Sequence, residues 1–250
     1  AVCVTGLAVV DLGKDLSLTG QIITLMLFQV GGLGIITFSV ILFGLMGKGI
    51  SFKEREIAQS TFLHTPRRDF IVVIKWVFVL TLIVESLGTV ILFLRFLADF
   101  SPGRAFYLGL YHAVSAFNNC GYSLFSDSLM SYRGDWIINF TIMLLIVLGG
   151  IGFVVQYELY QKIRGRQKRL SLHSKIVLFM TGVLILGGAT FFYLFEMDQT
   201  IKNMPLTTGI LVSFFQSITA RTSGFNTVDI SSLTNATLLL LIILMFIGAS

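Results

Sequence analysis

Charged residues are scarce in this chain of 250 residues, of which only 12% are Asp, Glu, Lys or Arg. A soluble domain of ordinary composition carries about a quarter. Long stretches lack charge altogether, including those between Asp15 and Lys48 and between Lys175 and Glu196. Because ~20 apolar residues suffice for a helix to cross the hydrocarbon core of a bilayer, the composition argues against a soluble enzyme. It predicts an all-α membrane protein with several spans.

Cysteine and catalytic motifs are also scarce. The two cysteines, Cys3 and Cys120, form no CxxC pair and carry no disulfide signal. The three histidines are scattered, without HExxH or other metal-binding spacing. GxSxG and a carboxylate pair within the apolar runs are missing as well. These absences count against an intramembrane hydrolase, and we expect no enzymatic activity.

Five stretches are predicted to cross the membrane as helices, at residues 19–47, 70–98, 136–160, 174–195 and 234–250. Two further uncharged stretches, 105–126 and 203–220, contain amide, hydroxyl and imidazole side chains that hydrocarbon penalises. Their status depends on the charge distribution in the loops.

The basic residues determine the expected topology. Loops 48–68 and 162–175 hold eleven of the 18 Lys and Arg residues, and short basic loops remain cytoplasmic. The spans 70–98 and 136–160 lie between these loops and already bring the chain back to the cytoplasmic side. The stretch 105–126 therefore must enter and leave the membrane on the outer face. The same count of crossings makes 203–220 re-entrant as well. Re-entrant backbone is tolerated only where it lines a cavity or is buried in protein, which makes both stretches functional candidates.

The two basic loops allow a second interpretation. Besides setting topology, they could dock a cytosolic regulator or anionic lipid. Binding of nucleic acid is not expected, because the loops lie between spans. Arg104 and Arg221 are expected to flank the pore segments outside the membrane core.

One pattern occurs three times. Gly6, Gly121 and Gly224 are each followed by an apolar or aromatic residue and, five or six positions later, by an aspartate. Each copy then leads into a predicted span with glycines, and the last two copies follow a short apolar helix. The repeating unit is therefore an outer helix, a pore helix, an extended glycine-bearing strand and an inner helix.

The repeat divides the chain into three parts. Residues 1–47 are the end of a first unit, 48–160 a second with cytoplasmic linker 48–68, and 161–250 a third with linker 161–174, truncated in its inner helix. Around a pseudo-fourfold pore this makes about two and a half of four units. We expect the native protein to be longer at both ends.

The glycines suggest how a cation could pass. Rings of main-chain carbonyls replace the hydration shell of an ion in selectivity filters, and glycine permits the required backbone angles. The predicted filter residues are Val4, Thr5, Gly6, Asn119, Cys120, Gly121, Thr222, Ser223 and Gly224. The predicted pore-mouth residues are Asp11, Asp127 and Asp229, where acidic groups would concentrate cations; a helix N-cap is the alternative role for each.

Other residues remain open to two interpretations. Glycines of the inner helices, such as Gly31 and Gly149, either permit close helix packing or act as hinges. Glu85, in the middle of a predicted span, is either a functional ionisable group or a carboxyl that bonds neighbouring helices.

These motifs resemble those of the Trk/Ktr/HKT superfamily of potassium transporters, along essentially all 250 residues. The resemblance rests on residues 4–11, 29–34, 115–121 and 222–226, and is strongest to the bacterial Ktr-type membrane subunit. It implies four pseudo-repeats, one pore per chain, and a homodimer in the lipid bilayer of the bacterial inner membrane. It also implies a cytosolic ring of nucleotide-binding subunits.

The resemblance further implies potassium uptake, which is often sodium-dependent. Potassium is therefore the transported ion that we expect, and sodium is the second candidate. Serine at the first filter glycine accompanies sodium transport in relatives, and Gly6 therefore favours potassium. The resemblance places an intramembrane gate at Gly248, Ala249 and Ser250. The alternative function is an alternating-access, cation-coupled secondary transporter, which predicts inverted repeats, whereas both complete pore loops here are expected on one face.

Overall fold

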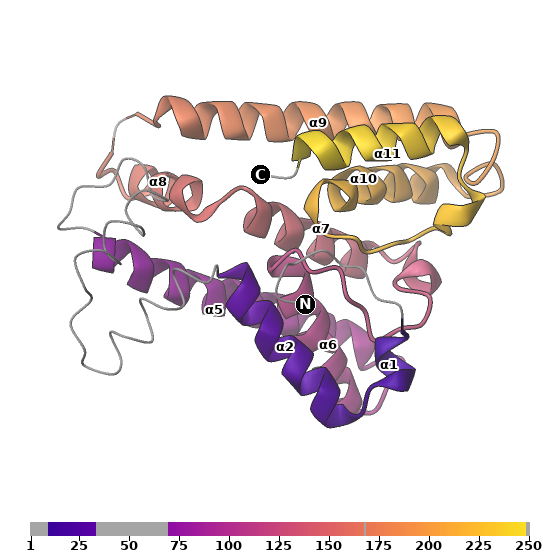
Figure 1. Ribbon diagram of the computed structural model, residues 1–250, viewed down its shortest axis with the longest axis horizontal. Coiled ribbons are helices and arrows are strands. Elements are labelled where there is room, and N and C mark those ends of the chain that lie inside the picture. Colours follow the sequence, from indigo (N-terminus) through magenta and orange to yellow (C-terminus); the bar gives the residue numbers. More distant parts are fainter. Residues whose placement is uncertain (1–9, 34–69, 168, 249–250) are drawn as a thin grey trace.

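The computed structural model describes residues 10–33, 70–167 and 169–248. Within these ranges the chain forms α-helices and short 3-10 turns, without β-strands (Figure 1), so the predicted all-α class is confirmed. The elements are α1 (Leu12–Asp15), α2 (Leu18–Gly32), α5 (Phe70–Phe96), α6 (Pro102–Phe117), η1 (Met130–Tyr132), α7 (Trp136–Gly150), α8 (Phe153–Ile163), α9 (Leu172–Glu196), α10 (Leu206–Thr222), η2 (Ile230–Ser232) and α11 (Asn235–Gly248).

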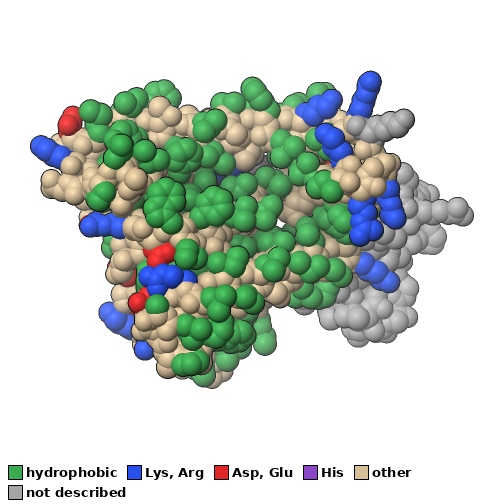
Figure 2. Space-filling model, turned by 180° about the vertical axis from the view of Figure 1, so that it is seen from behind, with side chains coloured by type: hydrophobic (Ala, Val, Ile, Leu, Met, Phe, Trp, Pro, Cys, Tyr) green, Lys and Arg blue, Asp and Glu red, His purple; other side chains and the backbone are tan. Residues whose placement is uncertain are grey.

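Among the described residues, two helices are long and apolar enough to cross a membrane: Lys75–Phe96 within α5, and α9. The helices α2 and α11 are apolar but shorter. Leucines on the outer surface of the long helices, such as Leu87 and Leu186, are each 60% exposed. Figure 2 shows that hydrophobic side chains cover much of this face. Such a surface suits contact with lipid rather than water.

The predicted span over 136–160 is not one continuous helix but a pair of helices, α7 and α8. The chain bends by 99° between α7 and α8. Gly152 at the break has a φ of 82°, a conformation that glycine adopts without the strain other residues incur. The Gln156 side chain donates to the carbonyl of Leu148 across the bend, which satisfies an acceptor at the end of α7.

The two pore segments each begin and end at the same end of the molecule. Arg95, in the last turn of α5, donates to Asp135, which caps the start of α7. In the next repeat, Glu196 at the end of α9 accepts from the backbone N–H of Thr234, one residue before α11. The segments between these paired ends therefore return to the side they start from, as a re-entrant path requires.

Basic residues gather at the opposite end of the molecule. Figure 2 shows Lys and Arg side chains around α8 and the start of α9. Lys162, Arg164 and Lys175 are exposed there. This placement agrees with a cytoplasmic loop between these helices. Loop 48–68 lies outside the described residues.

Candidate functional site

The site is built around two short pore helices, α6 and α10. Both run from the same end of the molecule toward its middle, where an irregular segment takes the chain back. Much of α6 is buried, including Tyr111 and His112 at 0% exposure, and α10 is buried around Phe215. Surrounding helices thus enclose the backbone that follows each pore helix.

Two of the three predicted glycines lie side by side. Gly121 and Gly224 have φ angles of 70° and 95°, in the left-handed region that favours glycine. A Cβ on Gly121 would overlap the carbonyl oxygen of Ser223 and lie 3.0 Å from the carbonyl carbon of Gly224. The strand after α6 therefore contacts the strand after α10 directly. Val4, Thr5 and Gly6 lie outside the described residues.

A cavity of about 220 Å³ opens beside these glycines. Its lining includes Gly121, Ser123 and Ser126 from the segment after α6, Gly224 from the segment after α10, and Asp11 from the start of α1. The structure thus brings residues of all three predicted units to one largely polar space. Asp127 and Asp229 do not line it.

The other described filter residues surround this space less directly. Cys120 is buried and not in a disulfide, and its Sγ lies 3.6 Å from the carbonyl oxygen of Asn118. Asn119 has a φ of 53°, which turns the chain out of α6. Ser223 is 1% exposed. Asn119, Cys120 and Ser223 are not among the residues that line the cavity.

The sequence interpretation missed two hydroxyl groups that hold the strands. Ser115 Oγ donates to the carbonyl oxygen of Tyr122 over 2.8 Å, and Thr219 Oγ1 donates to that of Phe225 over 2.9 Å. Both acceptors directly follow a predicted filter glycine. Aligning the two pore helices would have shown a hydroxyl residue at similar positions in both.

His112 is a third missed residue. Its Nδ1 lies 2.8 Å from the carbonyl oxygen of Leu108, and its Nε2 lies 2.9 Å from Ser123 Oγ. A carbonyl only accepts, so Nδ1 carries a proton and donates to Leu108, while Nε2 is hydrogen-bonded to the Ser123 hydroxyl. His112 therefore positions the strand that lines the cavity.

Two of the three predicted mouth aspartates, Asp11 and Asp229, are N-caps. Asp11 accepts from the N–H groups of Gly13 and Lys14 at the start of α1. Asp127 accepts from Ser131 beside η1, and Asp229 from Ser231 beside η2. The N-cap role that the sequence left open is therefore confirmed for Asp11 and Asp229, whereas the N-cap residue of η1 is Leu129.

Hydrogen bonds also keep two of these carboxyls acidic. A hydrogen bond with the Ser126 side chain is the largest cause that holds the pKa of Asp11 below its usual range. The Ser231 side chain does the same for the pKa of Asp229. Both groups lie outside the spans and carry negative charge at neutral pH.

Glu85 bonds neighbouring helices, as one of its two interpretations predicted. It is 5% exposed and accepts from Asn118 Nδ2 over 2.9 Å and from Gln29 Nε2 over 3.1 Å. These partners belong to the end of α6 and to α2. Glu85 thus links an inner helix, an outer helix and a pore helix.

Glycines of the inner helices pack against the inner ends of the pore helices. A Cβ on Gly149 would overlap the carbonyl oxygen of Phe117, and one on Gly32 would overlap the Asn118 side chain. A Cβ on Gly248 would lie 2.8 Å from Cβ of Arg221. Close packing therefore accounts for these glycines, whereas Gly152 occupies the bend.

The expected position of Arg221 outside the membrane core is wrong. Arg221 lies in the last turn of α10, the end farthest from the loops that enter the pore segments. Its Nη2 lies 3.3 Å from Thr181 Oγ1 of α9, and α11 packs on it through Gly248. A charged side chain thus lies between three helices.

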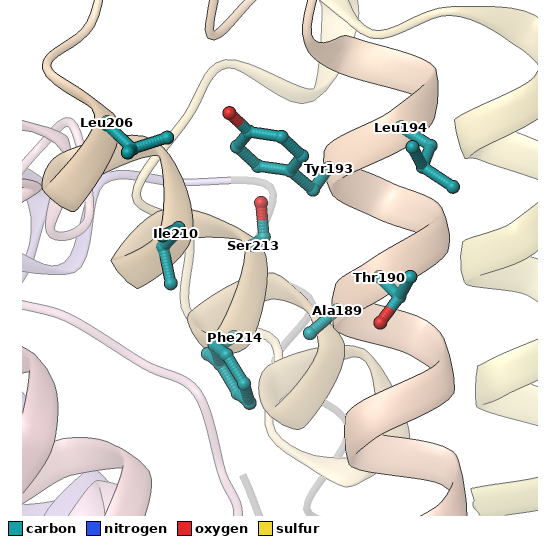
Figure 3. A pocket seen from close by; sticks show the side chains of 8 residues that line it. All are labelled: Ala189, Thr190, Tyr193, Leu194, Leu206, Ile210, Ser213 and Phe214. Carbon is teal, nitrogen blue, oxygen red and sulfur yellow. The ribbon is translucent and has the colours of Figure 1, made fainter.

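Two further crevices flank α10 but are apolar. One lies between α9 and α10 and is lined mainly by hydrocarbon, with the Tyr193 and Ser213 hydroxyls among its few polar atoms (Figure 3). The other lies between α7 and α10, with Trp136, Phe140 and Phe214 in its lining. Neither offers the oxygens that a cation requires.

Sequence comparisons identify the family of the chain. Residues 1–250 match the TrkH family, described as cation transport protein. The chain is 38% identical to Ktr system potassium uptake protein B of Vibrio alginolyticus, and 37% identical to the protein of that name from Bacillus subtilis. It is 30% identical to potassium/sodium uptake protein NtpJ of Enterococcus hirae.

Each of these alignments covers 100% of this chain and 55% or 56% of the relative. The chain therefore spans just over half the length of the relatives it matches. A family match along all its residues, with these identities, shows that the chain belongs to the TrkH family of cation transport proteins.

Proposed function

We propose that this chain forms much of the wall of a potassium uptake pathway, in which main-chain oxygens beside Gly6, Gly121 and Gly224 replace the water around the ion. The observation that carries the proposal is the direct approach of Gly121 to the Ser223 carbonyl. Two loops from different repeats meet there with glycine backbone and without bulky side chains between them. The names of the relatives support potassium as the ion.

The pore helices add an electrostatic contribution. The C-terminal end of a helix carries a partial negative charge, and α6 and α10 end at Phe117 and Thr222, a few residues before Gly121 and Gly224. A cation between the loops would therefore be stabilised by both helix ends. Val4 and Thr5 of the first unit, with Asn119, Cys120, Thr222 and Ser223, would complete the set of peptide oxygens.

The surroundings of the pathway follow from the same proposal. Asp11, Asp127 and Asp229 would concentrate cations at the outer mouth, and Gly248, Ala249 and Ser250 would begin the gate. The predicted units 1–47, 48–160 and 161–250 would occupy successive positions around the axis.

A homodimer in the bacterial inner membrane, with cytosolic nucleotide-binding subunits, is the proposed assembly. Its support is the words "Ktr system" in the names of two relatives. They indicate a component of a larger system.

The decisive experiment is Gly121→Ser in the full-length protein, expressed in cells that lack potassium uptake. The new side chain would displace the Ser223 carbonyl, so we expect loss of growth on low potassium and weaker selectivity for potassium over sodium. Gly165→Ser is the matched control, because Gly165 has nearly the same φ, 71°, but nothing within 4 Å of a new Cβ. Growth and selectivity of Gly121→Ser equal to those of the control would refute the proposal.

The second candidate function is an alternating-access, cation-coupled transporter. The 99° break between α7 and α8 favours it, since broken helices are common at the ion sites of such transporters. Flux into vesicles with potassium alone, sodium alone or both ions separates the two functions. A sodium-coupled transporter carries sodium and potassium together in a fixed ratio, whereas a pore carries potassium without an accompanying sodium flux, even if sodium activates it.

A further inference from the structure

Each pore helix holds the extended segment that follows it through one residue, which forms one backbone bond and one hydroxyl bond. In α6, the carbonyl of Ser115 accepts from the backbone N–H of Cys120 over 2.8 Å, and the Ser115 hydroxyl donates to the carbonyl of Tyr122. In α10, the carbonyl of Thr219 accepts from the N–H of Gly224 over 3.2 Å, and its hydroxyl donates to the carbonyl of Phe225. One pore-helix residue thus bonds the strand on both sides of the glycine's Cα.

Both donors and the Phe225 acceptor are well shielded from water, whereas Tyr122 is 8% exposed and lines the cavity. Ser115 is 0% exposed, Thr219 is 3% exposed, and Phe225 is 0% exposed. A buried carbonyl that loses its donor incurs a desolvation penalty, so each hydroxyl strongly favours one orientation of its peptide group. The orientation points the oxygen after the glycine at the pore helix.

The direction of these oxygens matters for an ion beside the glycines. An oxygen directed at a pore-helix hydroxyl is turned away from the space between the two strands, whereas the Ser223 oxygen, which precedes its glycine, points at Gly121 of the other strand. The peptide oxygen before the glycine therefore faces the other loop, and the peptide oxygen of the residue after the glycine faces the pore helix. Ion selectivity depends on the number and placement of such oxygens.

We propose that Ser115 and Thr219 are positioning residues that set the outer limit of the ion site, by withholding the Tyr122 and Phe225 carbonyls from the ion. This inference rests on the proposed potassium pathway and adds which peptide oxygens serve it. Without the hydroxyl, the peptide group after the glycine can rotate toward the ion. A site with altered oxygen number discriminates less well between potassium and the smaller sodium ion.

The test measures potassium and sodium uptake by the full-length protein in the same vesicle preparation. Thr219→Val removes the hydroxyl but keeps the shape of the side chain, and Ser115→Ala removes it from α6. We expect each to lower the ratio of potassium to sodium uptake by about threefold to tenfold, in proportion to one net hydrogen bond. Thr219→Ser and Ser115→Thr retain the hydroxyl and should retain the parent ratio.

Ser213→Ala is the matched control. Ser213 is also a buried hydroxyl residue of α10, but its Oγ donates to the Gly209 carbonyl within the same helix, and it faces the crevice toward α9 (Figure 3). Its loss should leave the ratio unchanged. A loss of folding or expression lowers both fluxes together, so the ratio reports on the ion site itself.

The outcomes separate this inference from the proposed function. If the parent protein takes up no potassium, the proposed function fails. If the parent takes up potassium selectively and Thr219→Val has the same ratio as Ser213→Ala, the positioning role is refuted. Thr219→Val tests the positioning role even if Ser115→Ala accumulates poorly, because valine keeps the shape and packing of the threonine side chain.

Discussion

The side-chain amide of Asn118 donates to the carboxyl of Glu85 over 2.9 Å. Asn118 directly follows α6 and precedes the predicted filter residue Asn119, while Glu85 lies in the middle of α5. Gln29 of α2 donates to the other carboxyl oxygen. The cluster therefore fixes the inner end of a pore helix to the inner helix of the preceding repeat.

We expect Glu85→Leu to destabilise the protein. The substitution removes an acceptor that the Asn118 and Gln29 amides share, and each hydrogen bond lost costs about 0.5–1.5 kcal/mol. Thermal unfolding of the full-length protein in detergent measures the effect. The unfolding temperature should fall.

Thr81→Val provides the control on the same helix. Thr81 is 0% exposed, and its hydroxyl has no hydrogen-bond partner within the described part of the chain. Replacing it by the isosteric Val should leave stability unchanged or raise it. If Glu85→Leu unfolds at the same temperature as Thr81→Val, the polar cluster contributes nothing to stability.

Gly149→Ala tests close packing between an inner helix and a pore helix. The new Cβ would overlap the carbonyl oxygen of Phe117 and lie 3.3 Å from Asn119 Nδ2. Overpacking of this kind costs about 1–3 kcal/mol, so both stability and potassium uptake should fall. Unfolding temperature and vesicle uptake are the measurements.

Gly187→Ala separates packing from helix propensity. Gly187 lies in α9 with nothing within 4 Å of a new Cβ. Alanine is favoured over glycine inside a helix by about 1 kcal/mol, so this variant should be slightly more stable than the parent. A similar gain in Gly149→Ala would show that Gly149 is not a packing residue.

The sequence allowed the re-entrant paths to be predicted, because loop charges constrain parity without knowledge of any contact. It also allowed Gly121 and Gly224 to be paired, since the repeat places each after a pore helix. The bend at Gly152 was not predictable in the same way. An apolar run that contains a glycine is compatible with a continuous helix and with a bent one. Only the packing of α7 and α8 distinguishes these two conformations.

The hydroxyl anchors escaped prediction for a different reason. Ser115 and Thr219 look like ordinary small helix residues, and their function depends on the strand returning past the helix that precedes it. That return is a tertiary feature, so the hydroxyl shared by the two aligned helices would not by itself have shown which carbonyl it bonds. The aspartates were ambiguous because the same carboxyl can cap a turn and attract a cation, and Asp11 is placed to do both.

Gly248→Ala tests the contact between α11 and α10. A Cβ at position 248 would lie 2.8 Å from both Cβ and Cγ of Arg221. The inner helix would have to shift from the pore helix just where the proposed gate begins. We expect altered uptake rates at unchanged selectivity, measured by potassium and rubidium flux into vesicles.

The control for this change is Gly182→Ala on α9. Gly182 has nothing within 4 Å of a new Cβ, so its uptake rate should equal that of the parent. A Gly248→Ala protein with the parent rate would show that this contact does not influence the gate. A change in selectivity instead would place the effect at the filter.

Asp11→Asn tests electrostatic attraction at the mouth. Asn caps a helix about as well as Asp, so α1 should persist while the negative charge beside the cavity is lost. We expect weaker apparent affinity for potassium at low ionic strength, with the difference shrinking as salt screens the charge. Asp229→Asn gives the comparison: Asp229 also caps a turn but does not line the cavity, so its loss should weaken the affinity less than the loss of Asp11 does.

The pH dependence follows from the sign of the pKa shift. The Ser126 side chain is the largest cause that lowers the pKa of Asp11 below its value in the unfolded chain, so its charge is lost only when the pH falls through that lowered value. The difference in affinity between parent and Asp11→Asn should therefore stay constant from about pH 5 to pH 8, where an ordinary aspartate is also ionised. A difference that disappears within this range would mean that another titrating group, and not Asp11, supplies the attraction.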